Sequence, residues 1–258
     1  MDQPRLSVVV PAYHEGPSIA AAVGRIRDEL APLAERGGLE IVVVDDGSGD
    51  GTAEAARGAG ADRVIELPVN RGKGAAVRAG VLAAAGRTIA FTDADLSYAP
   101  AQIEGLARAV EEGWDVVVGN RYHEGSTTIV EAGLLRRIGG RAINLATRAV
   151  LSTTRSDTQC GLKAFEHDAA KVLFGRSRID GFAFDVEILH LAERYDLAIL
   201  EVPVEVANSD RSTVHVARDA VRLLVDLARI RREDFLGHYD LPEPVGAART
   251  PRGGGSAE

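Results

Sequence analysis

Short runs of β-branched apolar residues alternate with helical segments along the first half of the chain. Each run is followed by a polar or glycine-rich cluster and then by apolar residues at helical spacing. The expected strands span residues 6–10, 40–44, 64–67 and 87–91, and the expected helices span 18–33, 53–59 and 75–85. This alternation is typical of βαβ units, so it predicts an α/β fold with a mostly parallel central sheet and helices on both faces.

The second half of the chain continues the pattern less regularly. We expect helices over 102–112, 129–151, 168–174, 182–194 and 214–232, and strands over 114–119, 162–165 and 198–206. The segments 129–151 and 214–232 combine apolar and basic residues. Either one is suited to lie in the plane of a membrane surface, and either one is equally suited to pack on the core as an ordinary amphipathic helix.

Composition limits the domain count and the kind of partner. With 258 residues, 45% of them apolar and 26% charged, we expect one domain over 1–236 and a disordered, glycine-rich tail over 237–258. A net charge of −8 argues against nonspecific binding to nucleic acid. The one cysteine, Cys160, is expected to be a small packed residue. The sequence has no apolar run of about 18 residues, so we expect a cytoplasmic protein whose membrane contact, if any, is peripheral, at the inner face of the cell membrane.

Two carboxylates, Asp93 and Asp95, follow the expected strand 87–91 directly. Acidic residues separated by one residue are common in surface turns. At the carboxyl end of a buried parallel strand, however, both can turn toward one hard cation such as Mg²⁺ or Mn²⁺, which fills the rest of its shell with water and substrate phosphates. We therefore expect Asp93 and Asp95 to be metal ligands for a phosphate-bearing substrate.

A second acidic pair, Asp45 and Asp46, ends the strand 40–44 before a glycine-rich turn. A carboxylate there is suited to accept hydrogen bonds from a nucleotide base, while the glycines let the base approach the backbone. The alternative is a helix-capping turn, which explains Asp50 and Thr52 but not the doubled aspartate.

Pro11, Tyr13 and Glu15 follow the first strand. An aromatic ring and a carboxylate at this position are suited to hold a base and a ribose, although an ordinary loop at the end of a strand explains the same residues equally well.

Basic residues follow two further strands. Lys73 lies in Arg71-Gly-Lys-Gly74 at the expected start of a helix, where cations and free amide groups favour an anion. Arg121 follows the strand 114–119, and a guanidinium matches phosphate oxygens. Arg136 and Arg137 are the alternative phosphate ligands, but they also fit the solvated face of a helix.

These motifs together resemble the family 2 glycosyltransferases with the GT-A fold. The resemblance is carried by Val-Val-Val-Pro-Ala-Tyr-His-Glu15, Asp45-Asp-Gly-Ser-Gly-Asp-Gly-Thr52, Asn70-Arg-Gly-Lys-Gly74, Asp93-Ala-Asp95, Gly119-Asn-Arg-Tyr122 and Asp157-Thr-Gln-Cys-Gly-Leu-Lys-Ala-Phe165. Within the family, the polyprenyl-phosphate sugar transferases are most similar, and the dolichyl-phosphate glucosyl branch is nearer than the mannosyl branch.

The resemblance implies a role for each of these residues. Pro11, Tyr13, Glu15, Asp45 and Asp46 would hold the nucleoside. Lys73 and Arg121 would meet the phosphates, and Asp93 and Asp95 would hold the metal and diphosphate. Where some relatives place a glutamine that meets the metal, this chain has Ser97.

The expected reaction is an inverting, metal-dependent transfer of a hexose, glucose being favoured, from UDP-glucose to a polyprenyl phosphate. Asp95, Arg121 and Asp157 are the expected catalytic residues. A phosphate acceptor is already ionised, so it needs no strong base, whereas a hydroxyl acceptor would need one, and Asp157 or Asp185 would supply it.

Three alternatives stay open. They are a soluble enzyme with a hydroxyl acceptor, a transferase that uses GDP-mannose, and a protein that binds nucleotide sugars without turnover. A Rossmann dehydrogenase is disfavoured because no Gly-x-Gly-x-x-Gly follows the first strand.

Overall fold

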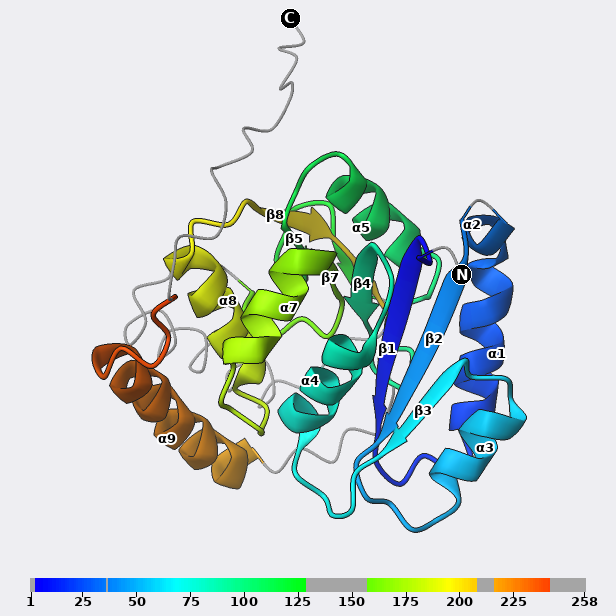
Figure 1. Cartoon of the computed structure of the whole chain (residues 1–258), viewed down its shortest axis with the longest axis horizontal. Helices are drawn as coiled ribbons and strands as arrows, with labels where there is room; N and C mark the ends of the chain where they lie inside the picture. Colours follow the sequence, from blue (N-terminus) through cyan, green and yellow to red (C-terminus); the bar gives the residue numbers. More distant parts are fainter. Residues whose placement is uncertain (1–2, 36, 129–156, 208–215, 242–258) are drawn as a thin grey trace, which may run out of the picture.

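The computed structural model describes residues 3–35, 37–128, 157–207 and 216–241. Its centre is a seven-stranded sheet (Figure 1) with the order β3-β2-β1-β4-β7-β5-β8. The strands are β1 (Leu6–Ala12), β2 (Leu39–Asp45), β3 (Arg63–Glu66), β4 (Thr88–Phe91), β5 (Val116–Asn120), β7 (Lys163–Glu166) and β8 (Ile199–Pro203). Strand β7 runs antiparallel to both of its neighbours and every other pairing is parallel. The α/β fold with a mostly parallel sheet is therefore confirmed.

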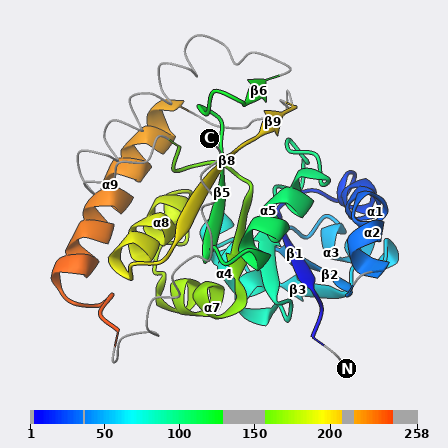
Figure 2. The ribbon, with the colours of Figure 1, turned by 90° about the horizontal axis from the view of Figure 1, so that it is seen from above.

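Helices cover both faces of the sheet, and two apolar clusters form between the layers (Figures 1 and 2). Side chains alternate along a strand, so in β1 Val8 and Val10 pack in one cluster and Val9 packs in the other. One face is covered by α1 (Ile19–Glu29), α3 (Thr52–Gly58) and α5 (Gln102–Glu111). The opposite face is covered by α4 (Lys73–Ala83), α7 (His167–Arg176), α8 (Phe184–Arg194) and α9 (Val216–Phe235).

Two expected elements are interrupted. The helix expected over 18–33 ends at Glu29, and α2 (Ala31–Glu35) follows it. Pro32 explains the break because it has no N–H to continue the first helix. The strand expected over 198–206 divides into β8 and β9 (Glu205–Val206), which pairs with β6 (Thr127–Thr128) in a second, two-stranded sheet.

The C-terminal helix packs on the molecule through one side. Leu223, Leu227 and Ile230 of α9 are buried in the cluster that holds α4 and α8. Tyr239, which lies beyond the expected domain end at residue 236, is fully buried, and its hydroxyl donates to Glu187 Oε1 at 2.6 Å. The packed part of the chain therefore reaches past that expected boundary.

Some expectations concern residues outside the described ranges. These are the helix over 129–151, with Arg136 and Arg137, and most of the expected tail. Within the described ranges, no helix combines the length and the hydrophobicity that a bilayer crossing requires.

Candidate active site

The metal-binding candidates lie at the carboxyl end of the central strand β4. Asp93 and Asp95 follow Phe91 and Thr92 directly, and the loop continues through Leu96, which has a φ of +48°. A left-handed conformation is unfavourable for a leucine, so the buried surroundings must hold the turn in place. Ser97 donates from its backbone N–H to Asp95 Oδ1 at 3.0 Å and from its hydroxyl to Oδ2 at 2.9 Å. The turn thereby fixes the direction of the Asp95 carboxylate.

Lys73 is paired with Asp93. Its ammonium Nζ lies 2.5 Å from Asp93 Oδ1, and the Lys73 side chain is 18% exposed. Burial acts to lower the pKa of Lys73, but the charges of Asp93 and Asp185 outweigh it and raise this pKa above the ordinary value. Lys73 is therefore a fixed cation beside the acidic pair, at the first residue of α4.

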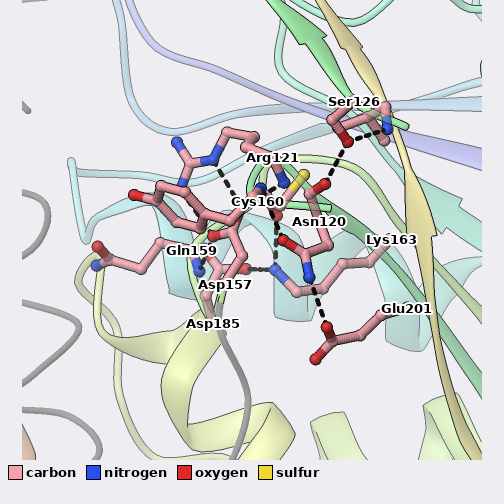
Figure 3. A network of polar contacts seen from close by, with 11 residues as sticks. Asn120, Arg121, Ser126, Asp157, Gln159, Cys160, Lys163, Asp185 and Glu201 are labelled. Carbon is pink, nitrogen blue, oxygen red and sulfur yellow. Dashed lines mark hydrogen bonds and ion pairs between the residues drawn. The ribbon is translucent and has the colours of Figure 1, made fainter. Parts of the chain in front are cut away.

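Arg121 and Asp157 form a second charged pair nearby (Figure 3). Arg121 Nε and Nη2 donate to the two carboxylate oxygens at 2.7 and 2.8 Å, and the Arg121 backbone N–H donates to Oδ2 at 2.9 Å. Burial acts to raise the pKa of the fully buried Asp157, but the hydrogen bonds and charge of Arg121 outweigh it and hold this pKa below the ordinary value. Asp157 is therefore an ionised partner of Arg121, and this state makes it a weak proton acceptor.

Beneath this pair lies a buried ion pair that sequence reasoning missed (Figure 3). Lys163 of β7 donates from Nζ to Asp185 Oδ1 at 2.5 Å and to the Cys160 carbonyl at 2.6 Å. The Lys163 side chain is 0% exposed and that of Asp185 is 5% exposed. Burial raises the pKa of Asp185, while the charges of Lys163 and Lys73 oppose the shift. A lysine inside the apolar run 162–165 was the available signal, because buried lysines need a partner.

The loop before β7 closes against the acidic pair. A Cβ on Gly161 would run into the carboxylate of Asp93, so a glycine is needed for this approach. Cys160 is fully buried, in agreement with the packing role expected for it. Because β7 is antiparallel, the loop that precedes this strand lies at the same edge of the sheet as the loops that follow the parallel strands.

Asp45 and Asp46 make hydrogen bonds within the chain. Asp46 accepts from the backbone N–H groups of Arg71 and Gly72 at 2.8 and 2.7 Å, and burial raises its pKa. Asp45 accepts from the backbone N–H of Ser48 at 3.0 Å and from the Ser48 hydroxyl. Asp45 also lines an open hollow of about 390 Å³ with Gly47, Ser48, Gly49, Glu66, Leu67 and Pro68.

Pro11, Tyr13 and Glu15 lie at the same edge, at the end of β1 and just beyond it. Tyr13 is 46% exposed and contacts the His14 ring with a centroid separation of 4.1 Å. The Glu15 carboxylate accepts from the Ser18 hydroxyl, and its backbone N–H donates to Thr52 Oγ1 at 3.0 Å. The loops after β1 and β2 are therefore tied together.

A divalent metal fits this site only with help from other ligands. Among the described residues, no group of three or more His, Cys, Asp or Glu side chains is arranged to hold a metal ion. Asp93 and Asp95 offer hard carboxylate oxygens, the ligand type that Mg²⁺ and Mn²⁺ prefer when substrate phosphates and water complete the shell. The donor set therefore fits a metal that arrives with a phosphate-bearing substrate.

The fold and site define the class of protein. A mostly parallel seven-stranded sheet covered by helices is shared with solved glycosyltransferase structures and is the GT-A fold. The chain belongs to the glycosyl transferase family 2, whose family model matches residues 7–174.

Curated relatives extend the similarity over most of the chain. A dolichyl-phosphate beta-glucosyltransferase of Dictyostelium discoideum is 31% identical over 255 residues, covering 93% of this chain and 78% of the relative. The protein of the same name from Drosophila melanogaster is 34% identical over 226 residues, covering 80% and 68%.

The solved structures include glucosyl-3-phosphoglycerate synthase from Mycobacterium tuberculosis. Its complex with phosphoglyceric acid is 25% identical, with a TM-score of 0.63 and coverage of 87% of this chain and 80% of that one. Its complex with Mn²⁺, UDP and glucosyl-3-phosphoglycerate is 25% identical, with a TM-score of 0.59 and coverage of 93% and 81%.

Proposed function

We propose that this glycosyltransferase moves a hexose, with glucose favoured, from a UDP-sugar to a polyprenyl phosphate, with inversion at the anomeric carbon. The observation that carries the proposal is the ion pair of Lys73 and Asp93 beside Asp95, at the carboxyl end of β4. The names of the curated relatives support the sugar and the lipid phosphate.

Asp93 and Asp95 are the proposed ligands of Mg²⁺ or Mn²⁺. A bound divalent ion supplies charge neutralisation for the departing diphosphate. Lys73 adds a fixed positive charge at the N-terminus of α4, where it would face the phosphates of the donor. The Mn²⁺ and UDP in a solved relative support this assignment.

The nucleoside is proposed to lie at the ends of β1 and β2. The hollow beside Asp45, after β2, is the proposed binding site of the base. Tyr13 offers an exposed ring after β1, the strand next to β2 in the sheet. Pro11 and Glu15 would contact the ribose side. Asp46 would act through the Arg71 and Gly72 amides that it holds.

Arg121 is the proposed ligand of the acceptor phosphate. Its guanidinium carries five N–H donors, and two of them donate to Asp157; among the described residues no side chain accepts from the others, which we assign to phosphate oxygens. Its side chain is 35% exposed, which leaves it within reach of a substrate. Asp157 would take part in catalysis by orienting the Arg121 guanidinium.

Neither candidate base is suited to activate a hydroxyl acceptor. Asp157 has a lowered pKa and is fully buried, and Asp185 is bound to Lys163 beneath the site. A phosphate acceptor is already ionised at neutral pH and needs no proton removed, so both observations favour a lipid phosphate over a hydroxyl.

The second candidate is a hydroxyl acceptor on a small phosphorylated metabolite. It is favoured by the similarity to glucosyl-3-phosphoglycerate synthase, which was solved with phosphoglyceric acid. An assay of UDP release distinguishes the two functions. The enzyme is given UDP-glucose and Mn²⁺, and the acceptor is either dolichyl phosphate in detergent or 3-phosphoglycerate. Release that depends only on 3-phosphoglycerate would refute the lipid acceptor. A thermal-shift screen of UDP-glucose against GDP-mannose, with and without Mn²⁺, identifies the donor.

A polyprenyl acceptor requires contact with a membrane surface, and α9 is the proposed contact. Between residues 222 and 236, the exposed residues are Arg222, Leu224, Val225, Ala228, Arg229, Arg231, Arg232, Phe235 and Leu236. The exposed side of α9 is therefore basic and apolar, although the chain as a whole carries a net charge of −8. Its positive charges and apolar side chains are suited to bind an anionic bilayer. The proposal places the protein in the cytoplasm, peripheral to the inner face of the cell membrane. Flotation with anionic but not with neutral liposomes is the expected result.

A further inference from the structure

We propose that Asp180 is a positioning residue for Lys73, which it directs by holding, together with Asp46, the segment Arg71–Gly74. The inference rests on the proposed function, in which Lys73 meets the phosphates of the donor. Asp180 lies in the loop between α7 and α8, far from Lys73 in the sequence, and nothing in the motif pattern points to it.

Asp180 contacts the start of α4 through both its backbone and its side chain. Its carbonyl oxygen accepts from the backbone N–H of Ala75 at 3.1 Å. Its carboxylate pairs with Arg71 at 3.0 Å and with Arg78, whose side chain is 17% exposed. One residue thereby holds both the segment before α4 and the first two turns of that helix.

The two segments touch without side chains between them. A Cβ on Gly72 would lie 2.6 Å from the Asp180 carbonyl oxygen, and a Cβ on Gly74 would lie 2.6 Å from that of Ile179. Real Cβ atoms do not approach an oxygen so closely, so both glycines are required for this contact. The glycines on either side of Lys73 therefore allow the loop that carries Asp180 to contact the backbone beside Lys73, in addition to any contact of that backbone with substrate.

Asp46 holds the same segment from the end of β2. Its two carboxylate oxygens accept from the backbone N–H groups of Arg71 and Gly72. The backbone that carries Lys73 is thus fixed between two aspartates, and its ammonium is directed at Asp93. A cation held in advance loses less conformational entropy when it binds phosphate.

The loop that carries Asp180 is itself fixed. The buried Glu187 accepts from the backbone N–H groups of Arg178 and Ile179 at 2.7 and 3.0 Å, and from the Tyr239 hydroxyl. Helices α4, α7 and α8 lie on the same face of the sheet (Figures 1 and 2). Asp180 therefore has a rigid base from which to hold the segment.

The test variant is Asp180→Asn, which keeps the backbone contact and the size of the side chain but removes the charge that holds Arg71 and Arg78. We expect the Kd for UDP with Mn²⁺ and the KM for UDP-glucose to rise about tenfold. The KM for the acceptor should change by less than about twofold. Asp180→Glu, which keeps the charge, should recover part of the loss. The matched control is Glu104→Gln, which removes a surface partner of Arg108 at 3.3 Å on the opposite face.

Amide hydrogen exchange tests the positioning without any substrate. Peptides covering 69–76 should exchange faster in Asp180→Asn than in the native protein or in Glu104→Gln, and peptides from β1 should not change. The proposal would be overturned if these peptides exchanged at the same rate in Asp180→Asn and in the native protein. It would also be overturned if they exchanged faster in the variant while its affinity for UDP was unchanged. If the native protein binds no nucleotide while exchange still rises in the variant, the proposed function fails and the structural role of Asp180 stands.

Discussion

Lys73 Nζ and Asp93 Oδ1 lie 2.5 Å apart, so a proposed phosphate ligand occupies an oxygen of a proposed metal ligand. The ammonium has further N–H donors and the carboxylate has a second oxygen, so phosphate and metal have room to bind beside this pair. While the pair is intact, however, the positive charge of Lys73 weakens the attraction of Asp93 for a cation.

This pairing of charges predicts opposite effects for Lys73→Met. Removing the ammonium frees Asp93 and removes a nearby positive charge, so Mn²⁺ should bind about fivefold more tightly in the absence of donor. The same change removes a fixed cation from the diphosphate, so kcat/KM should fall about 100-fold. Calorimetric titration with Mn²⁺ and a steady-state assay measure the two effects. Weaker Mn²⁺ binding in the variant would contradict the shared role of Asp93.

Asp95→Asn tests the second proposed metal ligand. Replacing a charged oxygen by an amide weakens a hard-cation site, so transfer should fall by about 100-fold or more. Ser97→Ala is the matched control. It removes only one hydrogen bond to the Asp95 carboxylate and should cost less than about tenfold. Turnover in Asp95→Asn with the native dependence on metal concentration would refute the assignment.

Gly161→Ala tests the approach of the loop before β7 to the acidic pair. The added methyl group would run into the Asp93 carboxylate, so we expect about 1–3 kcal/mol loss of unfolding free energy together with weaker Mn²⁺ binding. Gly105→Ala is the control, because an added Cβ there meets nothing within 4 Å and lies inside α5. That variant should be as stable as the native protein or more stable. Urea unfolding measures the stability of both variants. If Gly161→Ala is as stable as the native protein, the close approach of Gly161 to Asp93 does not require a glycine.

The buried pair of Lys163 and Asp185 should show strong coupling. Lys163→Met leaves a carboxylate enclosed without its partner, and about 3–5 kcal/mol of unfolding free energy should be lost. The double variant Lys163→Met with Asp185→Leu removes both charges and should recover a large part of the loss. A double-mutant cycle by urea unfolding measures the coupling, and additive losses would show that the two charges do not depend on each other.

The pair of Arg121 and Asp157 sets a dependence on pH. Because the folded pKa of Asp157 is below its ordinary 3.8, its contribution to stability is complete above about pH 4 and is lost as the pH falls through the folded pKa. The difference in unfolding free energy between the native protein and Asp157→Asn should be constant from pH 5 to 8 and should shrink below pH 4. Guanidinium unfolding over this range measures it, and a change between pH 5 and 8 would contradict the lowered pKa.

The sequence predicted the side of the sheet on which the site lies, because each motif follows a strand and carboxyl ends of parallel strands meet at one edge. It did not predict how the charges pair. The contacts of Asp93 with Lys73 and of Arg121 with Asp157 join residues that are far apart in the sequence, and spacing along the chain carries no information about them. The ligand roles of these residues stay predictions.

Two other features required the three-dimensional structure. Asp46 follows a strand, as expected for a residue that binds a base, yet its two carboxylate oxygens accept from the Arg71 and Gly72 amides. Lys163 lies in an apolar run whose pattern predicts a strand but does not identify a partner for the lysine. The partner, Asp185, lies on α8, a helix on one face of the sheet. Backbone hydrogen bonds and buried charge pairs of this kind depend on packing, which a sequence pattern does not specify.

The reversed direction of β7 also bears on how the chain between β5 and β7 can change in length. Strand β5 ends at Asn120 and the neighbouring β7 begins at Lys163, with Val118 and Lys163 opposite each other in the register. The chain therefore departs from β5 and enters β7 at adjacent points on a single rim. A change in the number of residues between these two points would leave the pairings among β1, β2, β3 and β4 unchanged.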